Sequence, residues 1–240
     1  MANKLPITKS YTISLIAICA SLYAVIGYLT YLGIFAPAIG VVRFWPAVFL
    51  PAVFSIVFGP LVGAAGAAIG IFISDMIIHG NALLSLTVGV PANFIGFYLV
   101  GEIYRKSGSE RKILAMTVLE LSVAFIVAAL FYSYGLLPMD LLIASLIALV
   151  ATLVPALFFK GDDRRIVFAG STGLMVGSAI IGIGVWAFSQ FFLLPTGDRN
   201  LPFWAAFAWF IWTYVTEVPF IALLAPPTIR VIRKAVVTRG

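Results

Sequence analysis

The sequence predicts an all-α protein, a single bundle of about eight membrane-spanning helices that includes residues 1–240. Three observations predict this fold. Hydrophobic residues make up 62% of the chain and charged residues only 10%, whereas soluble domains carry about 25% charged residues. The apolar residues form continuous runs close to the ~20 residues that cross a bilayer as a helix, without the alternation of a membrane β-barrel. Finally, the basic residues gather between alternate runs.

Eight apolar segments are the expected spans. They are residues 11–33, 44–58, 60–79, 84–101, 113–133, 140–159, 167–194 and 203–225. The second and fourth are short, and Pro46, Pro51 and Pro91 are expected to bend them, because proline cannot complete the helical hydrogen-bond ladder. The second and third are expected to form a tight hairpin that turns at Gly59-Pro60.

The distribution of basic residues predicts the orientation. With eight spans, thirteen of the fifteen Lys and Arg residues fall on one side of the membrane, and only Arg43 and Arg199 fall on the other. The positive-inside rule then places both termini in the cytoplasm. The net charge of +6 is explained by this rule, so we expect no nucleic-acid partner. The predicted localisation is the cell membrane, as a multi-pass protein.

Two stripes of small residues predict close helix packing. Between Phe58 and Asp75 one stripe falls within a narrow helical arc, and it consists of Gly59, Gly63, Gly66, Gly70 and Ser74. Small residues at such spacing let another membrane helix approach closely. At ~100° per residue, Asp75 lies on a different face from this stripe. The second stripe is in the first span and contains Ala20 and Ala24.

Motifs of soluble enzymes are absent from the sequence. It has no GxxxxGK[ST] phosphate loop, no HExxH and no GxSxG, and it contains one histidine and one cysteine. We therefore expect no catalytic residues, no metal site and no cofactor. The informative residues are instead polar groups at membrane depth, which are costly there and are candidate functional groups by default.

The candidate substrate-binding residues lie mainly toward the predicted outer side. They are Arg43, Trp45, Asp75, His79, Asn81, Asn93 and Gln190. Two alternatives stay open among them: Arg43 and Asp75 form an ion pair without a ligand, and Asn93 bridges helices by hydrogen bonds. The deeper Glu120 and Glu217 either pair with basic residues or act as coupling groups.

Three elements in order resemble the substrate-binding S components of energy-coupling factor (ECF) transporters. They are the AxxxA motif of Ala20 and Ala24, the segment RFWPAVFLPAVFSIVFGP at 43–60, and the glycine-striped helix ending in Ser74-Asp75, followed by HGNALLSLTVGVPANFIGFYLVG at 79–101. The resemblance covers residues 1–104, and 105–240 match only in general character. S components commonly have six helices, so the eight predicted here are a departure.

The resemblance implies a function in vitamin uptake. It suggests a subunit that captures a vitamin-like micronutrient outside the cell and works with a membrane coupling subunit and two cytoplasmic ATPase subunits. Ala20 and Ala24 would dock on the coupling subunit, and Arg43 would meet an anionic group of the substrate. Two other classes stay open: a self-contained carrier or channel, which needs a continuous polar path, and a membrane-embedded lipid-modifying enzyme, which needs convergent catalytic groups.

Overall fold

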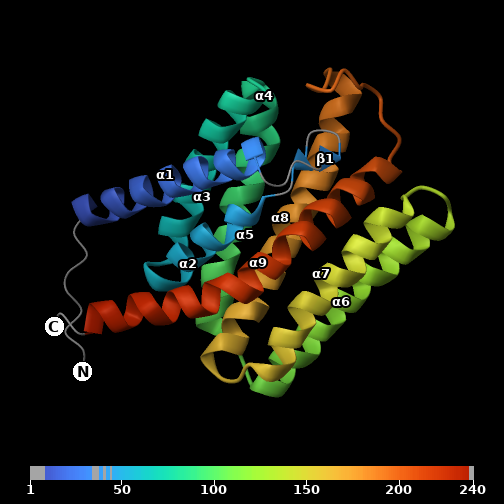
Figure 1. Cartoon of the computed structure of the whole chain (residues 1–240). Coiled ribbons are helices and arrows are strands. Elements are labelled where there is room, and N and C mark those ends of the chain that lie inside the picture. The colour runs from blue at the N-terminus through green and yellow to red at the C-terminus, as the bar shows by residue number, and fades with distance from the viewer. Residues whose placement is uncertain (1–8, 34–37, 40–41, 44, 238–240) are drawn as a thin grey trace.

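The computed structural model describes residues 9–33, 38–39, 42–43 and 45–237 as a bundle of helices (Figure 1). The α-helices are α1 (Lys9–Gly33), α2 (Phe49–Val57), α3 (Pro60–Ile78), α4 (Ala82–Leu84), α5 (Val90–Lys106), α6 (Glu110–Ser133), α7 (Met139–Phe158), α8 (Asp162–Phe191) and α9 (Trp204–Val237). A 3₁₀ turn, η1 (Pro46–Val48), precedes α2, and a π-helical turn, η2 (Ser85–Gly89), precedes α5. Two short antiparallel strands, β1 (Ala38–Ile39) and β2 (Val42–Arg43), lie between α1 and η1.

Seven of the described helical segments are long and apolar enough to cross a membrane, which supports a multi-pass membrane protein. They match seven of the eight predicted spans. The exception is the predicted span 44–58, which is the shorter helical segment Pro46–Val57. Its three residues in η1 and nine in α2 reach only about 18 Å at 1.5 Å per residue, less than the ~30 Å hydrocarbon core. Gly59, with φ of 120°, and Pro60 end it.

The predicted fourth span, 84–101, is not short. Residues 82–106 form one continuous helical segment, and Pro91 is accommodated at the start of α5. The π-helical turn η2 comes directly before this proline, where the missing N–H already interrupts the α-helical ladder. As a result the turn brings Ser85 and Gly89 against Asp75 of α3.

The glycine stripe of α3 packs within the bundle, as predicted. A Cβ atom on Gly63 would lie 2.5 Å from the Pro51 carbonyl oxygen of α2, and one on Gly70 would lie 2.8 Å from the Ala20 carbonyl oxygen of α1. Ser74 continues the contact, because its Oγ lies 3.5 Å from the Ala24 carbonyl oxygen. The two small-residue stripes therefore pack against each other.

This packing argues against the docking role predicted for Ala20 and Ala24, which itself stays a prediction. Their side chains are buried, with 3% and 5% of their surface exposed, and α3 covers their face of α1. Further along the same helix, the Trp45 ring occupies the space where a Gly27 side chain would be. A small-residue stripe can serve either another protein or another helix of the same chain, and here the partner is α3.

A second set of glycines joins the two halves of the bundle. Cβ atoms on Gly96 of α5 and Gly173 of α8 would lie 3.1 and 2.7 Å from the carbonyl oxygen of the other residue. Between α8 and α9, a Cβ on Gly182 would lie 2.3 Å from the Ala206 carbonyl oxygen. Helices α6 and α7 form a hairpin beside α8 and α9 (Figure 1).

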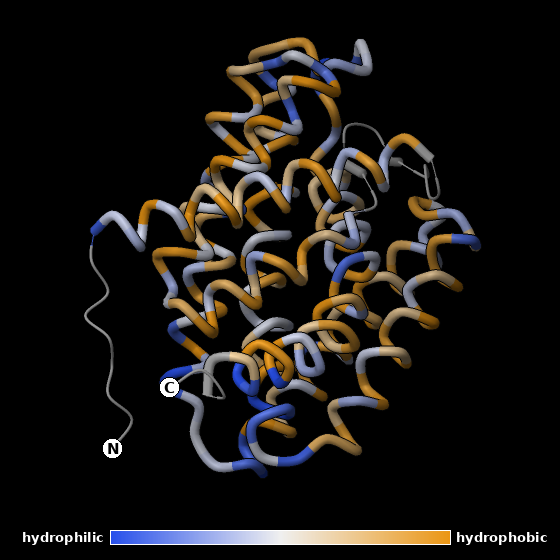
Figure 2. Tube along the Cα trace, turned by 60° about the vertical axis from the view of Figure 1, so that its left-hand side comes forward, coloured by the Kyte–Doolittle hydropathy of each residue, from blue (hydrophilic) through white to orange (hydrophobic). Residues whose placement is uncertain are grey.

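Charged side chains link several helix ends to one another. Arg164 of α8 pairs with Glu110 of α6 at 3.1 Å, and Arg230 of α9 pairs with Asp163 of α8 at 3.0 Å. Arg233 bonds to Asp162 and donates to the Tyr104 Oη of α5. In Figure 2 hydrophilic residues gather at this end near the end of α9. The basic residues that follow the fourth, sixth and eighth predicted spans therefore lie at one end of the bundle, as predicted. That this end faces the cytoplasm stays a prediction.

Candidate functional site

A cavity of about 100 Å³ lies inside the bundle between α1, α3, η2, α5, α8 and α9. Four glycines are part of its wall, Gly89, Gly96, Gly173 and Gly177. These residues bring the helix backbones together without filling the space between them. Its volume is comparable with the ~150 Å³ engineered apolar cavity that admits benzene, so it suits a small molecule. Unlike that cavity, its wall is partly polar.

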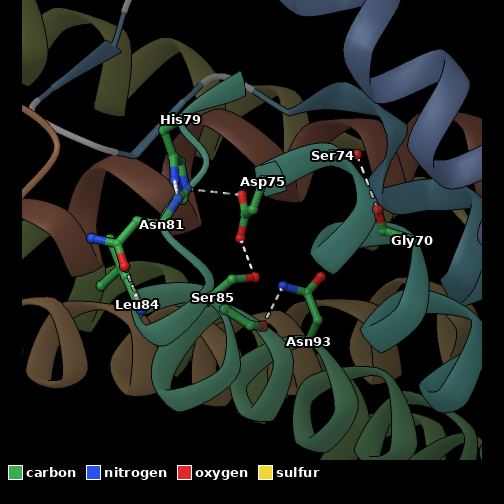
Figure 3. A network of polar contacts seen from close by, with 9 residues as sticks. Gly70, Ser74, Asp75, His79, Asn81, Leu84, Ser85 and Asn93 are labelled. Atoms are coloured by element: carbon green, nitrogen blue, oxygen red, sulfur yellow. Dashed lines mark hydrogen bonds and ion pairs between the residues drawn. The ribbon is translucent and has the colours of Figure 1, made fainter. Parts of the chain in front are cut away.

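Asp75 is the centre of the polar network on one wall of the cavity (Figure 3). It is only 5% exposed. Its Oδ2 accepts a hydrogen bond of 2.7 Å from the Ser85 hydroxyl, and its Oδ1 lies 3.4 Å from His79 Nε2. The Asn81 backbone N–H donates to His79 Nδ1 at 3.0 Å. Because Nδ1 accepts, the imidazole proton is directed to Nε2, on the side of Asp75.

Asn93 of α5 connects this wall to α1. Its Oδ1 accepts a hydrogen bond of 2.8 Å from the Tyr23 hydroxyl, and its Nδ2 donates to the Gly89 carbonyl oxygen at 2.9 Å. Asn93 therefore bridges helices and also lines the cavity. Tyr23 is fully buried and lies edge-on to Trp45 and Phe97, with ring centroids 6.1 Å apart in both pairs. These three aromatic residues form an apolar wall next to the amide.

Two hydroxyl groups line the cavity from the other half of the bundle. Ser178 belongs to α8 and Thr213 to α9, and they are 0% and 1% exposed. Among the described residues, neither Ser178 Oγ nor Thr213 Oγ1 has a hydrogen-bond partner. A buried polar group without a partner costs about 1–3 kcal/mol, and buried hydroxyls in helices usually bond to a carbonyl of their own helix. Glu217, one turn after Thr213, also lines the cavity and is buried.

The structure brings together four of the seven predicted substrate-binding residues, Trp45, Asp75, His79 and Asn93. Asn81 does not line the cavity, since its Oδ1 caps α4 by accepting from the Leu84 N–H. Gln190 lies elsewhere, and its Nε2 donates to the Leu201 carbonyl oxygen in the connection before α9. Both residues therefore have hydrogen bonds within the protein, and their predicted role in binding stays a prediction. The Arg43 side chain lies outside the described residues, so its predicted contacts with Asp75 and an anionic ligand stay predictions.

Glu120, the other deep carboxyl group, lies away from the cavity. It is buried between α6 and α8, and it accepts hydrogen bonds from Ser171 and Thr172 of α8. Among the described residues, no ion pair with a basic side chain reaches it, so the open alternative of an Arg or Lys partner is not observed here.

Sequence reasoning missed Tyr23, Ser85, Ser178 and Thr213. Each is weakly polar and lies in an apolar run, so none stands out by charge. Helical spacing provides a signal for one of them: Thr213 lies four residues before Glu217, which places both on one face of α9.

No family model, curated protein or solved structure matches this chain.

Proposed function

We propose that this chain captures a small solute inside its helix bundle and serves as the substrate-binding part of a membrane uptake system. The observation that carries the proposal is a pair of buried hydroxyls, Ser178 and Thr213, which line the cavity and have no hydrogen-bond partner within the described part of the chain. A ligand with hydrogen-bonding groups would satisfy both hydroxyls, and it would also meet Asn93 and Asp75 on the opposite side. Such groups at membrane depth are typical of solute pathways.

The lining also indicates what kind of solute fits. Besides its polar groups, the cavity is lined by the aromatic side chains of Tyr23, Trp45 and Phe97 and by Leu174 and other aliphatic side chains. Binding sites of this kind orient a mostly apolar molecule through a few hydrogen bonds. At about 100 Å³, the cavity favours a compact molecule. A larger vitamin-like solute would extend beyond this cavity.

The resemblance to ECF S components supports import driven by a membrane coupling subunit and two ATPase subunits. Because α3 covers Ala20 and Ala24, we propose that any coupling subunit binds a different surface. A self-contained carrier is the second candidate. The two differ in one result. With the coupling subunits absent, the purified chain in lipid vesicles binds the solute in either case, but only a carrier moves the solute across the vesicle membrane.

The geometry near Asp75 disfavours the enzyme alternative. Asp75, His79 and Ser85 are close together, but the serine hydroxyl donates to the carboxylate rather than to the imidazole. Activation of a serine nucleophile requires a base such as histidine to accept that proton, with the carboxylate orienting the histidine. Because Ser85 donates to Asp75 and not to His79, these three residues are better suited to binding a ligand than to activating a nucleophile.

Native mass spectrometry of the gently purified protein tests the proposal. We expect a bound small molecule in the wild type and its loss in Ser178→Trp, which fills the cavity. Thr213→Val keeps the shape but removes one neutral hydrogen bond, worth about 0.5–1.5 kcal/mol, so affinity should fall about two- to ten-fold.

Two matched controls separate binding from folding. Thr152→Val and Ser145→Ala also remove buried hydroxyls, but these lie on α7 and bond only to carbonyl oxygens of their own helix. Both should keep the ligand. A bound mass that survives Ser178→Trp unchanged, or a wild-type protein that carries no small molecule, would contradict the proposal.

A further inference from the structure

A second polar cluster lies outside the cavity, halfway along α6. Glu120 is ten residues after the start of that helix, which is about 15 Å along its axis. Its Oε2 accepts from Ser171 Oγ at 2.8 Å and its Oε1 accepts from Thr172 Oγ1 at 2.6 Å. Ser171 in turn lies 2.7 Å from the Tyr214 hydroxyl of α9. One carboxyl group thus connects three helices at membrane depth.

Among the described residues, the hydrogen-bond partners of this carboxyl group are both hydroxyls. Guanidinium and ammonium groups only donate, and they therefore hold a carboxylate in its ionised form. A hydroxyl can donate to a carboxylate or accept from a carboxylic acid after it rotates. In the pair of Ser171 and Tyr214 either oxygen can be the donor. The cluster can therefore hold Glu120 in both protonation states without moving a backbone atom.

The buried arginine of α8 is engaged elsewhere, and Arg165 beside it is exposed in the first turn of that helix. In α8, Arg164 bonds to Glu110 and to two carbonyl oxygens at the end of α7. In α7, the only titratable residue is Asp140. It lies in the first turn of that helix, which follows the C-terminal end of α6 in the chain. In α9, Tyr214 faces the cluster, and Glu217 lines the cavity. No described cation therefore fixes the charge of Glu120.

We propose that Glu120 is a proton-binding site within the membrane-spanning bundle. A proton taken from water neutralises the carboxylate, whose new hydroxyl then donates to Ser171, and Ser171 donates in turn to Tyr214. Release of the proton to water reverses each bond. Since an ionised carboxylate is costly away from water unless it is hydrogen-bonded, the hydroxyls that donate to Glu120 stabilise its charged form, and the reversed bonds stabilise its neutral form. The site gives the chain a response to protons that is independent of any solute.

Infrared spectroscopy of the purified protein in lipid, titrated from acidic to alkaline pH, tests this proposal without a known ligand. We expect a carbonyl stretch of a protonated carboxyl group that disappears as the pH rises and is absent in Glu120→Gln. Glutamine keeps the size of the side chain, and its oxygen can accept from one of the two hydroxyls while its NH2 group donates to the other oxygen, so this variant should fold. Ser171→Ala and Tyr214→Phe change the hydrogen bonds around the acid, and we expect them to shift the frequency of the band and the pH at which it disappears.

Glu217→Gln is the matched control, because it removes another buried carboxyl group of the same bundle. It should leave the Glu120 band in place. Spectra of the wild type and Glu120→Gln that are the same at every pH would overturn the proposal, as would a Glu120 band that does not change with pH. If Glu120→Gln does not fold, an unshifted band in both Ser171→Ala and Tyr214→Phe would overturn it equally.

Discussion

Replacing Ala20 by Trp is expected to destabilise the isolated protein strongly. Ala20 is 3% exposed, and the backbones at Gly66 and Gly70 of α3 leave no room for a larger side chain. Overpacking a close contact typically costs about 1–3 kcal/mol, and an indole placed between two helix backbones belongs at or above the top of that range. Thermal unfolding in detergent, followed by tryptophan fluorescence or circular dichroism, measures the effect.

Leu22→Trp provides the control. Leu22 lies on the same helix, but 39% of its surface is exposed, on a face that α3 does not cover. The Leu22→Trp variant adds the same indole, and it should unfold at close to the wild-type temperature. An Ala20→Trp protein that is as stable as the wild type would show that α1 does not pack on α3 at this position. It would also restore Ala20 as a candidate docking residue.

Hydropathy predicted most of the fold because the membrane constrains helices by length and by apolar character. Seven predicted spans match helices to within a few residues at most ends, and α9 extends further, to Val237. The predicted span at 44–58 is not confirmed, because the helix there is short and apolar character does not distinguish a crossing helix from a short one buried by its neighbours. Pro46 and Gly59 bound that segment, but local sequence does not show how closely α3 and α5 surround it.

The candidate site was predictable only in part. Asp75, His79 and Asn93 could be found because strongly polar groups are rare in membrane spans. Ser178 could not, since most serines and threonines in such helices bond to their own backbone, and for Thr213 the only signal was its position one turn before Glu217. That both hydroxyls lack a partner among the described residues is visible only in the structure. The small-residue stripe at Ala20 predicted close packing correctly, but periodicity does not identify the partner.

Replacing Gly173 by Val should have the other large effect, because this glycine is both a helix contact and part of the cavity wall. A Cβ at Gly173 would lie 2.7 Å from the Gly96 carbonyl oxygen and 3.0 Å from the Val100 backbone nitrogen. Backbone atoms cannot rotate away as side chains do, so α5 and α8 would have to separate. We expect a loss of more than about 3 kcal/mol, above the usual cost of overpacking, and little monodisperse protein in size-exclusion chromatography.

Gly108→Val is the matched control, since a Cβ at Gly108 would meet only the Lys112 side chain, at 4.0 Å. It makes the same chemical change between α5 and α6 and should leave folding intact. Gly177→Ala is an intermediate case, because its Cβ would lie 3.2 Å from the Ala92 carbonyl oxygen. A small shift relieves that contact, so this variant should fold and report on the cavity through weaker solute binding. Wild-type stability in Gly173→Val would mean that α5 and α8 do not cross at Gly96. The glycine-lined wall of the cavity, and with it the proposed solute site, would then have to be reconsidered.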